Sequence, residues 1–316
     1  MKKGRGLAAI ARAREDRSEG RTRWGAHAGS LAGAAIVGGL VLHSLVSHHD
    51  LATGKQALLS KQRAVAATLG AEWYPLRDRL ENDVLAAAKD YAGDLVDPRA
   101  RRREFRAQPG LYLRMRVAGA NDSAGVRAAA ADSRRDGFAA CLLREPNDRT
   151  ARGDADGGAF AQQPWNLGQA YLATRILDDA WVSAVKEADD ELRLRVFREQ
   201  YEKAEREELP VAIDVVKRAR FLLLVLDEDV PEAIVFADGG ALTEEALQLV
   251  AHPTRVHLFE LPSGKEVLRL RRSGDARVIP AGERVISDAA TRDAMQRQAN
   301  NCALAGLVDQ ELSQSR

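Results

Sequence analysis

Phe221 to Leu226 read FLLLVL, the most hydrophobic strand candidate in this chain of 316 residues. Strands that are buried on both faces of a sheet read as continuous apolar runs, and other predicted elements flank this run on both sides. We therefore expect it near the centre of a sheet. Pro210 is predicted to open a short helix just before it, because proline favours the first helical position.

Two segments nearer the N-terminus are also predicted as strands. Leu111 to Gly119, LYLRMRVAG, alternates apolar and basic residues with the period of a half-buried strand. Phe138 to Arg144, FAACLLR, is predicted as a second and more buried strand. The alanine-rich stretch from Ser123 to Asp136 is predicted as the helix between them, ending before Gly137.

The clearest local pattern is a β-hairpin. Arg255 to Leu261, RVHLFEL, and Glu266 to Arg271, EVLRLR, both alternate, and a short turn that contains Gly264 joins them. We predict a short helix from Thr243 to Val250 before the hairpin. A last helix is predicted from Ser287 to Leu312, with Ser287 as its N-cap.

The segment from Leu167 to Leu209 carries apolar residues at helical spacing and is predicted as a long solvated helix or a helical hairpin. A loop from Glu145 to Trp165 precedes it. Asp154 and Asp156 in this loop resemble part of a calcium loop, but the further ligands that an EF-hand needs are missing. We expect a surface loop and no metal site.

Residues 48–96 are predicted to form a helical stalk. Pro75 is expected to start a second helix within it or to kink a continuous one. One apolar stripe runs along the predicted helix and needs a partner, which is either the distal domain or a second copy of the stalk in a coiled coil. The stripe consists of Leu69, Trp73, Leu76, Leu80, Val84, Ala87, Tyr91 and Leu95.

Residues 97–110 are rich in arginine and bounded by prolines, and we interpret them as a linker to a globular domain over residues 111–316. An arginine cluster can bind the phosphates of lipid headgroups or nucleic acid. A solvated linker, or ion pairing with acidic side chains of the domain, is the simpler interpretation. The arginines are Arg99, Arg101, Arg102, Arg103 and Arg106.

The chain as a whole is 45% hydrophobic, which is near the globular norm, so most of it should fold. Residues 111–316 mix predicted helices with about five predicted strands, including one hairpin. The predicted fold class is therefore α+β, or α/β with a mixed sheet.

Residues 25–47 contain no charged side chain, in a chain in which 29% of the residues are charged. About 20 apolar residues in a helix span a bilayer, so this run is predicted as a single transmembrane helix. The tail over residues 1–24 holds eight basic and three acidic residues, eight minus three or +5, and the positive-inside rule keeps such a tail in the cytoplasm. A buried helix of a soluble domain and a cleaved secretory signal are the alternatives. We prefer an uncleaved single-pass signal-anchor, which places the bulk of the chain in the periplasm.

Gly25, Gly29 and Gly33 recur at every fourth position of this run and would line one helix face. Small residues at this spacing let two helices approach closely in lipid, so the anchor is a candidate for self-association. The alternative is that glycine and alanine are simply abundant in this sequence. A sensing role for the intramembrane His43 is less favoured than burial of a neutral imidazole.

Cys141 and Cys302 are the only cysteines, and no Cys-x-x-Cys spacing indicates redox catalysis or zinc binding. Outside the cytoplasm the two could form one disulfide that closes a long loop, worth about 3–5 kcal/mol by chain-entropy estimates. Two separately buried thiols are the alternative, and the sequence leaves both open.

Sequence motifs for phosphate loops, dinucleotide sites, nucleophile elbows and zinc proteases are absent. Asp227, Glu228 and Asp229 follow the predicted central strand, and open α/β sheets place ligands at strand ends. His257 lies within the hairpin and is interpreted as a residue of one sheet face rather than a general base. These four residues are weak catalytic candidates, and we expect no cofactor and no metal.

The formal net charge of +1 gives no case for a nucleic-acid partner. The main hypothesis is a membrane-anchored envelope protein whose extracytoplasmic domain has a non-catalytic interaction or scaffolding role. It would contact lipid through residues 25–47, an unidentified protein partner, and a second copy of itself through anchor and stalk. The alternative is a membrane-tethered hydrolase with carboxylate chemistry near Asp227. An enzyme needs a concave pocket with converging polar groups, whereas an adaptor needs an exposed apolar patch.

Overall fold

The computed structural model describes residues 50–102, 104–133, 136–143, 165–230, 243–276 and 288–314. The chain forms two compact units, one of residues 1–61 and 184–198 and the other of residues 62–183 and 199–316. The basic tail, the apolar run with Gly25, Gly29, Gly33 and His43, and the aspartates of the 145–165 loop lie outside the described residues. Each unit is described by itself below.

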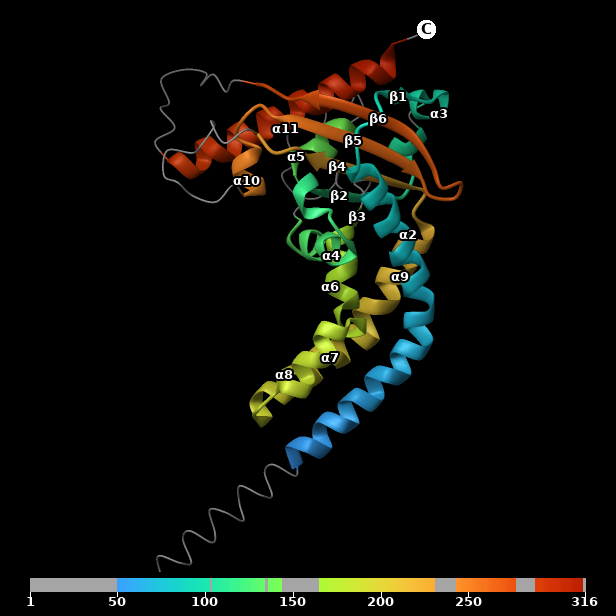
Figure 1. Ribbon diagram of the computed structural model, residues 1–316, viewed down its shortest axis with the longest axis vertical. Helices are drawn as coiled ribbons and strands as arrows, with labels where there is room; N and C mark the ends of the chain where they lie inside the picture. Colours follow the sequence, from blue (N-terminus) through green and yellow to red (C-terminus); the bar gives the residue numbers. More distant parts are fainter. Residues whose placement is uncertain are drawn as a thin grey trace, which may run out of the picture. The chain divides into compact units, whose positions relative to one another are not determined.

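The larger unit is built on a six-stranded mixed sheet with the strand order β1-β6-β5-β4-β2-β3 (Figure 1). β2 runs parallel to β3 and β4, while β4, β5, β6 and β1 pair antiparallel in turn. The predicted mixed sheet of an α/β or α+β fold is thus confirmed. The strands are β1 (Leu95–Val96), β2 (Gly110–Arg116), β3 (Trp165–Asn166), β4 (Phe221–Asp227), β5 (Pro253–Glu260) and β6 (Lys265–Ser273).

β4, which contains the FLLLVL run, lies between β2 and β5, and all of its residues are buried. The prediction of a central strand is therefore confirmed. β5 and β6 form the predicted hairpin, and Gly264 in its turn adopts a φ of 67°, a value that glycine tolerates best.

β2 differs from its prediction, because it is not half-buried. Six of its seven residues are buried, with Arg114 only 3% exposed. The alternation of apolar and basic residues in LYLRMR suggested a solvated face. In the structure β2 has β3 and β4 as neighbours and helices on both faces, so its basic residues find partners inside the protein.

The predicted strand at Phe138 to Arg144 was wrong, since residues 137–143 form the helix α5 (Gly137–Leu143). A short apolar run without alternation is compatible with either element. Phe138, Ala139 and Leu142 share the buried face of one helical turn, and an Asp136 carboxylate oxygen accepts the backbone N–H of Phe138 at 2.9 Å. The first helical turn is thereby capped.

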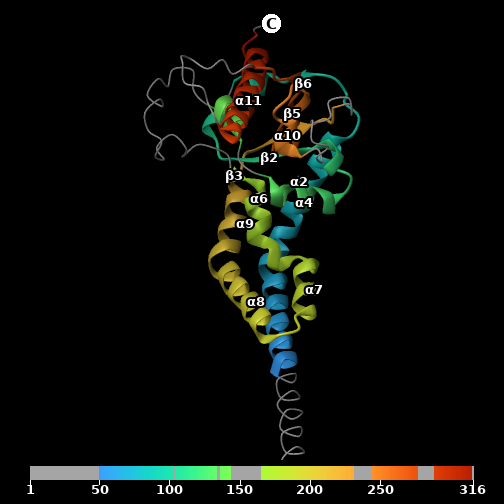
Figure 2. The ribbon, with the colours of Figure 1, turned by 90° about the vertical axis from the view of Figure 1, so that its left-hand side faces the viewer.

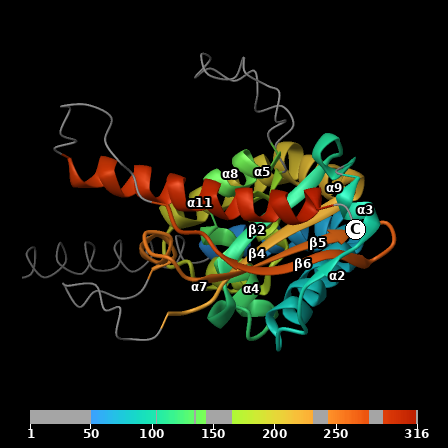
Figure 3. The same cartoon turned by 90° about the horizontal axis from the view of Figure 1, so that it is seen from above.

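Helices cover both faces of the sheet. On one face, α5 and α11 (Ala289–Ser313) bury Phe138, Leu304 and Val308 against residues of β2, β4, β5 and β6, and Figure 3 shows α11 running alongside the strands. On the other face, α4 (Ser123–Asp132), α6 (Leu167–Thr174) and α9 (Leu209–Arg218) pack against β2. Figure 2 shows α6 and α9 side by side.

The predicted stalk is helical over residues 50–65, forms a π-helical turn at Ala66–Gly70 and continues as α2 (Ala71–Ala88). Pro75 lies inside α2 and does not start it. Trp73 of the apolar stripe is fully buried and meets Tyr171 of α6 edge to face, with the ring centroids 5.9 Å apart. This part of the stripe therefore packs against its own globular unit. The helix ends earlier than predicted, since Leu95 belongs to β1.

The segment over residues 167–209, predicted as one long solvated helix or a helical hairpin, is a series of shorter helices. After α6 come a 3₁₀ turn (Arg175–Leu177), α7 (Asp179–Glu187), α8 (Glu191–Lys203) and a π-helical turn (Ala204–Glu208) that leads into α9. The smaller unit combines residues 50–61 with residues 184–198. Within it, Lys55 Nζ donates to the Lys186 carbonyl at 2.9 Å, and Leu51, Leu58, Val185 and Leu194 are buried.

Short capped helices account for the remaining elements. α10 (Glu244–Leu247) has Thr243 as its N-cap, where a helix start was predicted. α11 is capped by Asp288, whereas Ser287, the predicted cap, lies outside the described residues. No helix in the described part of the chain combines the length and the apolar character that a bilayer crossing requires, and residues 25–47 are not in that part.

The arginine-rich segment folds as α3 (Pro98–Arg101) and a 3₁₀ turn (Glu104–Ala107), with Phe105 buried. Arg99 pairs with Asp97 and with Glu260, at 3.1 and 2.8 Å. Arg106 pairs with Asp309 of α11 at 2.5 Å. Of the two interpretations of this cluster, ion pairing with the domain is the one that the geometry shows for these arginines.

We predict that Gly110→Ala in β2 destabilises the larger unit, because an added Cβ would come within 2.1 Å of the buried Phe221 ring. Overpacking of this kind costs about 1–3 kcal/mol. Gly306→Ala in α11 is the matched control, since nothing lies within 4 Å of its Cβ position, and it should stabilise the helix by about 0.5–1 kcal/mol. Urea denaturation followed by circular dichroism measures both, and equal effects of the two variants would contradict the packing described.

Candidate functional site

The register of the central strands brings polar side chains together on the sheet face that α5 and α11 cover. Side chains alternate between the two faces of a strand. Tyr112 of β2 and Val225 of β4 belong to the core beneath α5 and α11, so Arg114 and Asp227, each two residues further on, lie on the same face. Thr254 of β5 pairs with Asp227 in register.

Arg114 is the centre of this cluster. Its Nε and Nη2 donate to the two carboxylate oxygens of Asp227 at 2.7 and 2.8 Å, which is a bidentate ion pair. Its Nη1 donates to Asp136, just before α5, at 2.8 Å and to Asn301 of α11 at 2.6 Å. One buried guanidinium therefore ties two strands of the sheet to both covering helices.

Asp227 is fully buried and accepts two further hydrogen bonds. His252 Nε2 lies 2.8 Å from its Oδ1, and the Thr254 hydroxyl donates to the same oxygen at 3.1 Å. Burial alone would raise the pKa of Asp227, but the Arg114 charge and the hydrogen bonds from His252 and Arg114 outweigh it and hold this pKa well below its usual range. Asp227 is thus a fixed carboxylate.

His252 faces an acceptor with each ring nitrogen, since its Nδ1 lies 2.9 Å from the Val250 carbonyl oxygen and its Nε2 faces Asp227. The cluster therefore places the Arg114 guanidinium between two carboxylates, Asp227 and Asp136, and sets the His252 ring against Asp227.

Tyr112 and Asn301 extend the cluster on the α5 and α11 side. The Tyr112 hydroxyl donates to Asp136 at 2.6 Å. Burial first, and then the Asp136 carboxylate, raise the pKa of Tyr112 well above its usual value, so this hydroxyl stays protonated. Asn301 Nδ2 donates to the side chain of Gln248, in the segment that follows α10, at 3.2 Å.

The three sequence-predicted carboxylates separate in the structure. Asp227 points into the cluster, while Glu228 pairs with Arg255 and Arg271, and Asp229 pairs with Arg116 at 2.6 Å. Each of the three therefore neutralises an arginine. None of them is an unengaged acid or base.

His257, the fourth candidate, lies on the other face of the sheet. It pairs in register with Leu224, its ring stacks on Phe259, and its Nδ1 lies 2.6 Å from Glu266. It is 1% exposed, and its Nε2 has no hydrogen-bond partner among the described residues. The sheet lies between His257 and Asp227, so the two cannot act on one substrate.

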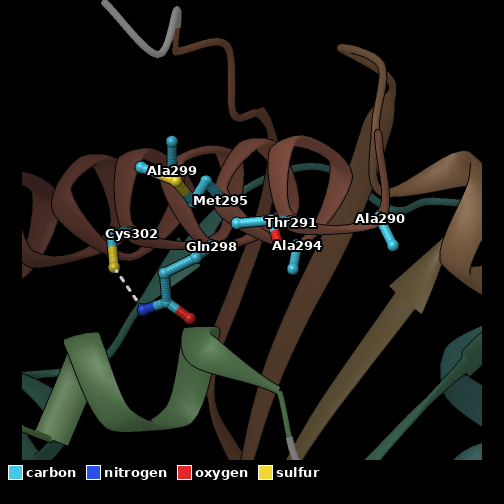
Figure 4. A pocket seen from close by; sticks show the side chains of 7 residues that line it. All are labelled: Ala290, Thr291, Ala294, Met295, Gln298, Ala299 and Cys302. Carbon is cyan, nitrogen blue, oxygen red and sulfur yellow. Dashed lines mark hydrogen bonds between the residues drawn. The ribbon is translucent and has the colours of Figure 1, made fainter. Parts of the chain in front are cut away.

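Cys141 of α5 and Cys302 of α11 form a disulfide bond across 161 residues of sequence, with their Cα atoms 5.2 Å apart. Beside it, α11 lines an open groove of about 690 Å³ (Figure 4). Gln298 Nε2 donates to the Cys302 sulfur at 3.2 Å, the contact drawn as a dashed line. The groove lining is Ala290, Thr291, Ala294, Met295, Gln298, Ala299 and Cys302.

In the buried cluster, the charged and polar side chains already form hydrogen bonds with one another. Its carboxylates, guanidinium and imidazole all have partners within 2.6–2.9 Å, and no group of three histidine, cysteine or acidic side chains within the described ranges could hold a metal ion. Among the described residues that line the groove on α11, none carries an ionisable side chain, since Cys302 is in the disulfide. The arrangement suits a structural junction better than the carboxylate hydrolase near Asp227.

No family model, no curated protein and no solved structure matches the chain. What the cluster does must therefore follow from its own geometry.

Sequence reasoning missed Arg114, Asp136, His252 and Asn301. One signal could have found part of the cluster, because Arg114 and Arg116 lie 113 positions before Asp227 and Asp229, respectively. Two basic residues spaced by two on one strand, and two acidic residues with the same spacing at and just beyond the end of another, predict neighbouring parallel strands.

We predict that Asp227→Asn lowers the free energy of unfolding by about 3–5 kcal/mol, because it leaves the buried Arg114 charge without its bidentate partner. Asp229→Asn is the matched control at the exposed end of the same pair of strands and should cost less than about 1 kcal/mol. Guanidinium denaturation measures both. Similar losses of unfolding free energy in the two variants would show that the buried Arg114–Asp227 pair contributes no more to stability than the exposed Arg116–Asp229 pair.

Glu244 at the start of α10 makes the stability of the folded state depend on pH. Burial, followed by the negative charge of Asp227, raises the pKa of Glu244 to about 7, against the opposing hydrogen bond from the Arg116 backbone. The folded state therefore holds a proton that the unfolded state has already lost above the ordinary glutamate pKa. This makes stability fall as the pH rises from about 4.5 to about 7.

We predict that Glu244→Gln removes this decline. The variant should match the wild type near pH 4 and be more stable near pH 8, whereas Glu245→Gln, its exposed neighbour, should keep the wild-type profile. Thermal melts across the pH range measure the effect. A Glu244→Gln profile parallel to the wild type would contradict the raised pKa.

Proposed function

We propose that this chain is a membrane-anchored envelope protein whose folded part lies outside the cytoplasm and has a non-catalytic interaction or scaffolding role. Residues 25–47 supply the anchor, and the basic tail of residues 1–24 stays in the cytoplasm. The sheet and its helices form the extracytoplasmic head.

The observation that carries this proposal is the disulfide between Cys141 and Cys302, the chain's only two cysteines. Disulfides persist in oxidising compartments and are rare in the cytosol. The disulfide between α5 and α11 therefore supports a location outside the cytoplasm for the folded part of the chain. The charge asymmetry of residues 1–24 predicts the same location.

The buried cluster supports the non-catalytic part of the proposal. Catalytic acids and bases need a protonation state that changes during the reaction and a position within reach of a substrate. Asp227 is fully buried, its pKa is held low, and it is bound by Arg114, His252 and Thr254. Such a carboxylate holds the fold together and is not poised to exchange protons.

Expression of the full chain in a Gram-negative host, with reporters fused after Arg23 or at Arg316, tests the proposal. We expect the Arg23 fusion to report from the cytoplasm, the Arg316 fusion from the periplasm, and extraction of the chain only by detergent. Both cysteines should resist maleimide, even after denaturation, until a reductant is added.

Two double variants, one in the anchor and one outside it, make this experiment more specific. Ile36→Arg with Leu40→Arg places two charges in the anchor, each costing about 2.5–3.5 kcal/mol at the centre of a membrane helix, and should release the chain from the membrane. Gln56→Arg with Ser60→Arg adds the same charges at the same spacing to exposed positions and should not. Full-length, uncut wild-type chain in the soluble fraction without detergent would refute the proposal.

A further inference from the structure

The groove on α11 is lined in part by one residue of the disulfide. Cys302 is part of its lining, while Cys141 is not among the lining residues. In Figure 4 the side chains of Gln298 and Cys302 lie on the same side of α11, toward α5. The rest of the lining is mostly apolar, and Met295 is 41% exposed.

The disulfide also lies at the boundary between two different halves of α11. From Asn300 onward the helix is anchored, because Asn301 binds Arg114 and Leu304, Val308 and Leu312 are in the core. From Ala289 to Met295 every residue is exposed. Because Cys302 lies within the anchored half, opening the disulfide would leave these contacts to the cluster and the core in place.

We propose that the Cys141–Cys302 disulfide is a thiol–disulfide exchange site, and that the groove admits the cysteine-bearing segment of a protein dithiol. A volume of about 690 Å³ is within the range of sites that hold whole ligands, and its apolar lining suits the side chains that flank such a cysteine. Cys302, as one half of a disulfide in the groove lining, is what selects a thiol as the chemistry of the occupant.

The exchange is a balanced two-electron step. A partner thiolate attacks the Cys302 sulfur, the sulfur–sulfur bond breaks, and Cys141 leaves as a thiolate that takes a proton from water. The partner's second thiolate then attacks its own mixed-disulfide sulfur and releases Cys302 as a thiolate, which is also protonated. The protein gains two electrons and two protons, and the partner dithiol becomes a disulfide.

Gln298 is a positioning residue for this exchange. Its amide nitrogen donates to the Cys302 sulfur at 3.2 Å and to the Cys141 sulfur at 3.6 Å. N–H donors stabilise a thiolate, so the same amide assists each sulfur as it leaves.

The test uses the purified full chain in detergent, oxidised at the start, so its outcome does not depend on where the chain sits in a cell. Thioredoxin serves as the protein dithiol and dithiothreitol as the small one, and trapped thiols are counted over time by maleimide gel shift without denaturant. The wild type should be reduced by thioredoxin at least about tenfold faster than it unfolds globally, as measured by pulse proteolysis.

Ala294→Trp fills the groove and should slow reduction by thioredoxin about tenfold while changing reduction by dithiothreitol less than about threefold. Val211→Trp, at an exposed apolar position on α9, is the matched control and should behave as the wild type. If Ala294→Trp does not fold, Met295→Trp, at another lining position, replaces it with the same expectation. Reduction no faster than unfolding, or equal rates in the groove and control variants, would overturn the proposal.

Gln298→Glu tests the positioning role, because a carboxylate beside the sulfurs disfavours the leaving thiolate. It should slow exchange with both dithiols several-fold near pH 7, and high salt should partly restore the rate because it screens the added charge. Gln310→Glu, an exposed change of the same charge on the same helix, should leave the rate and its salt dependence unchanged. Equal rates in the two variants would remove Gln298 from the site.

Discussion

The buried charge of Arg114 is the constraint on which the larger unit depends. A guanidinium within a covered sheet is costly unless its donors are matched, and here Asp227, Asp136 and Asn301 match them. Each partner comes from a different element, so satisfying this one side chain fixes how β4, α5 and α11 meet β2. Apolar residues of similar volume could give comparable stability, but they would not fix the arrangement so narrowly.

The sequence predicted the elements whose signals are local. The FLLLVL strand, the hairpin with its turn at Gly264 and the capped start of α10 at Thr243 depend on neighbouring residues, and the structure confirms them. The mixed sheet follows from the number and order of these elements. Local pattern could not distinguish the strand from the helix at residues 138–144, because a short apolar run satisfies both until its packing partners are known.

The buried cluster was less accessible to prediction for a physical reason. Its members come from positions as far apart in the sequence as Tyr112 and Asn301, and each of them alone is an ordinary polar residue. A basic residue in an alternating strand is normally solvated, so Arg114 was assigned to an exposed face. Only the matched spacing of Arg114 and Arg116 with Asp227 and Asp229 carried information about the neighbouring strand.

Neighbouring residues of α11 make different contacts, and this difference decides what the disulfide contributes. Asn301 binds the Arg114 cluster, Cys302 bonds to α5, and Leu304 enters the core. The cluster and the core already hold the C-terminal half of α11 on the sheet without the sulfur–sulfur bond. The sulfur–sulfur bond is therefore an additional link between α11 and α5, and not the contact that holds this half of α11 on the sheet. Opening it, as the proposed exchange requires, would leave the charge cluster and the core contacts of α11 in place.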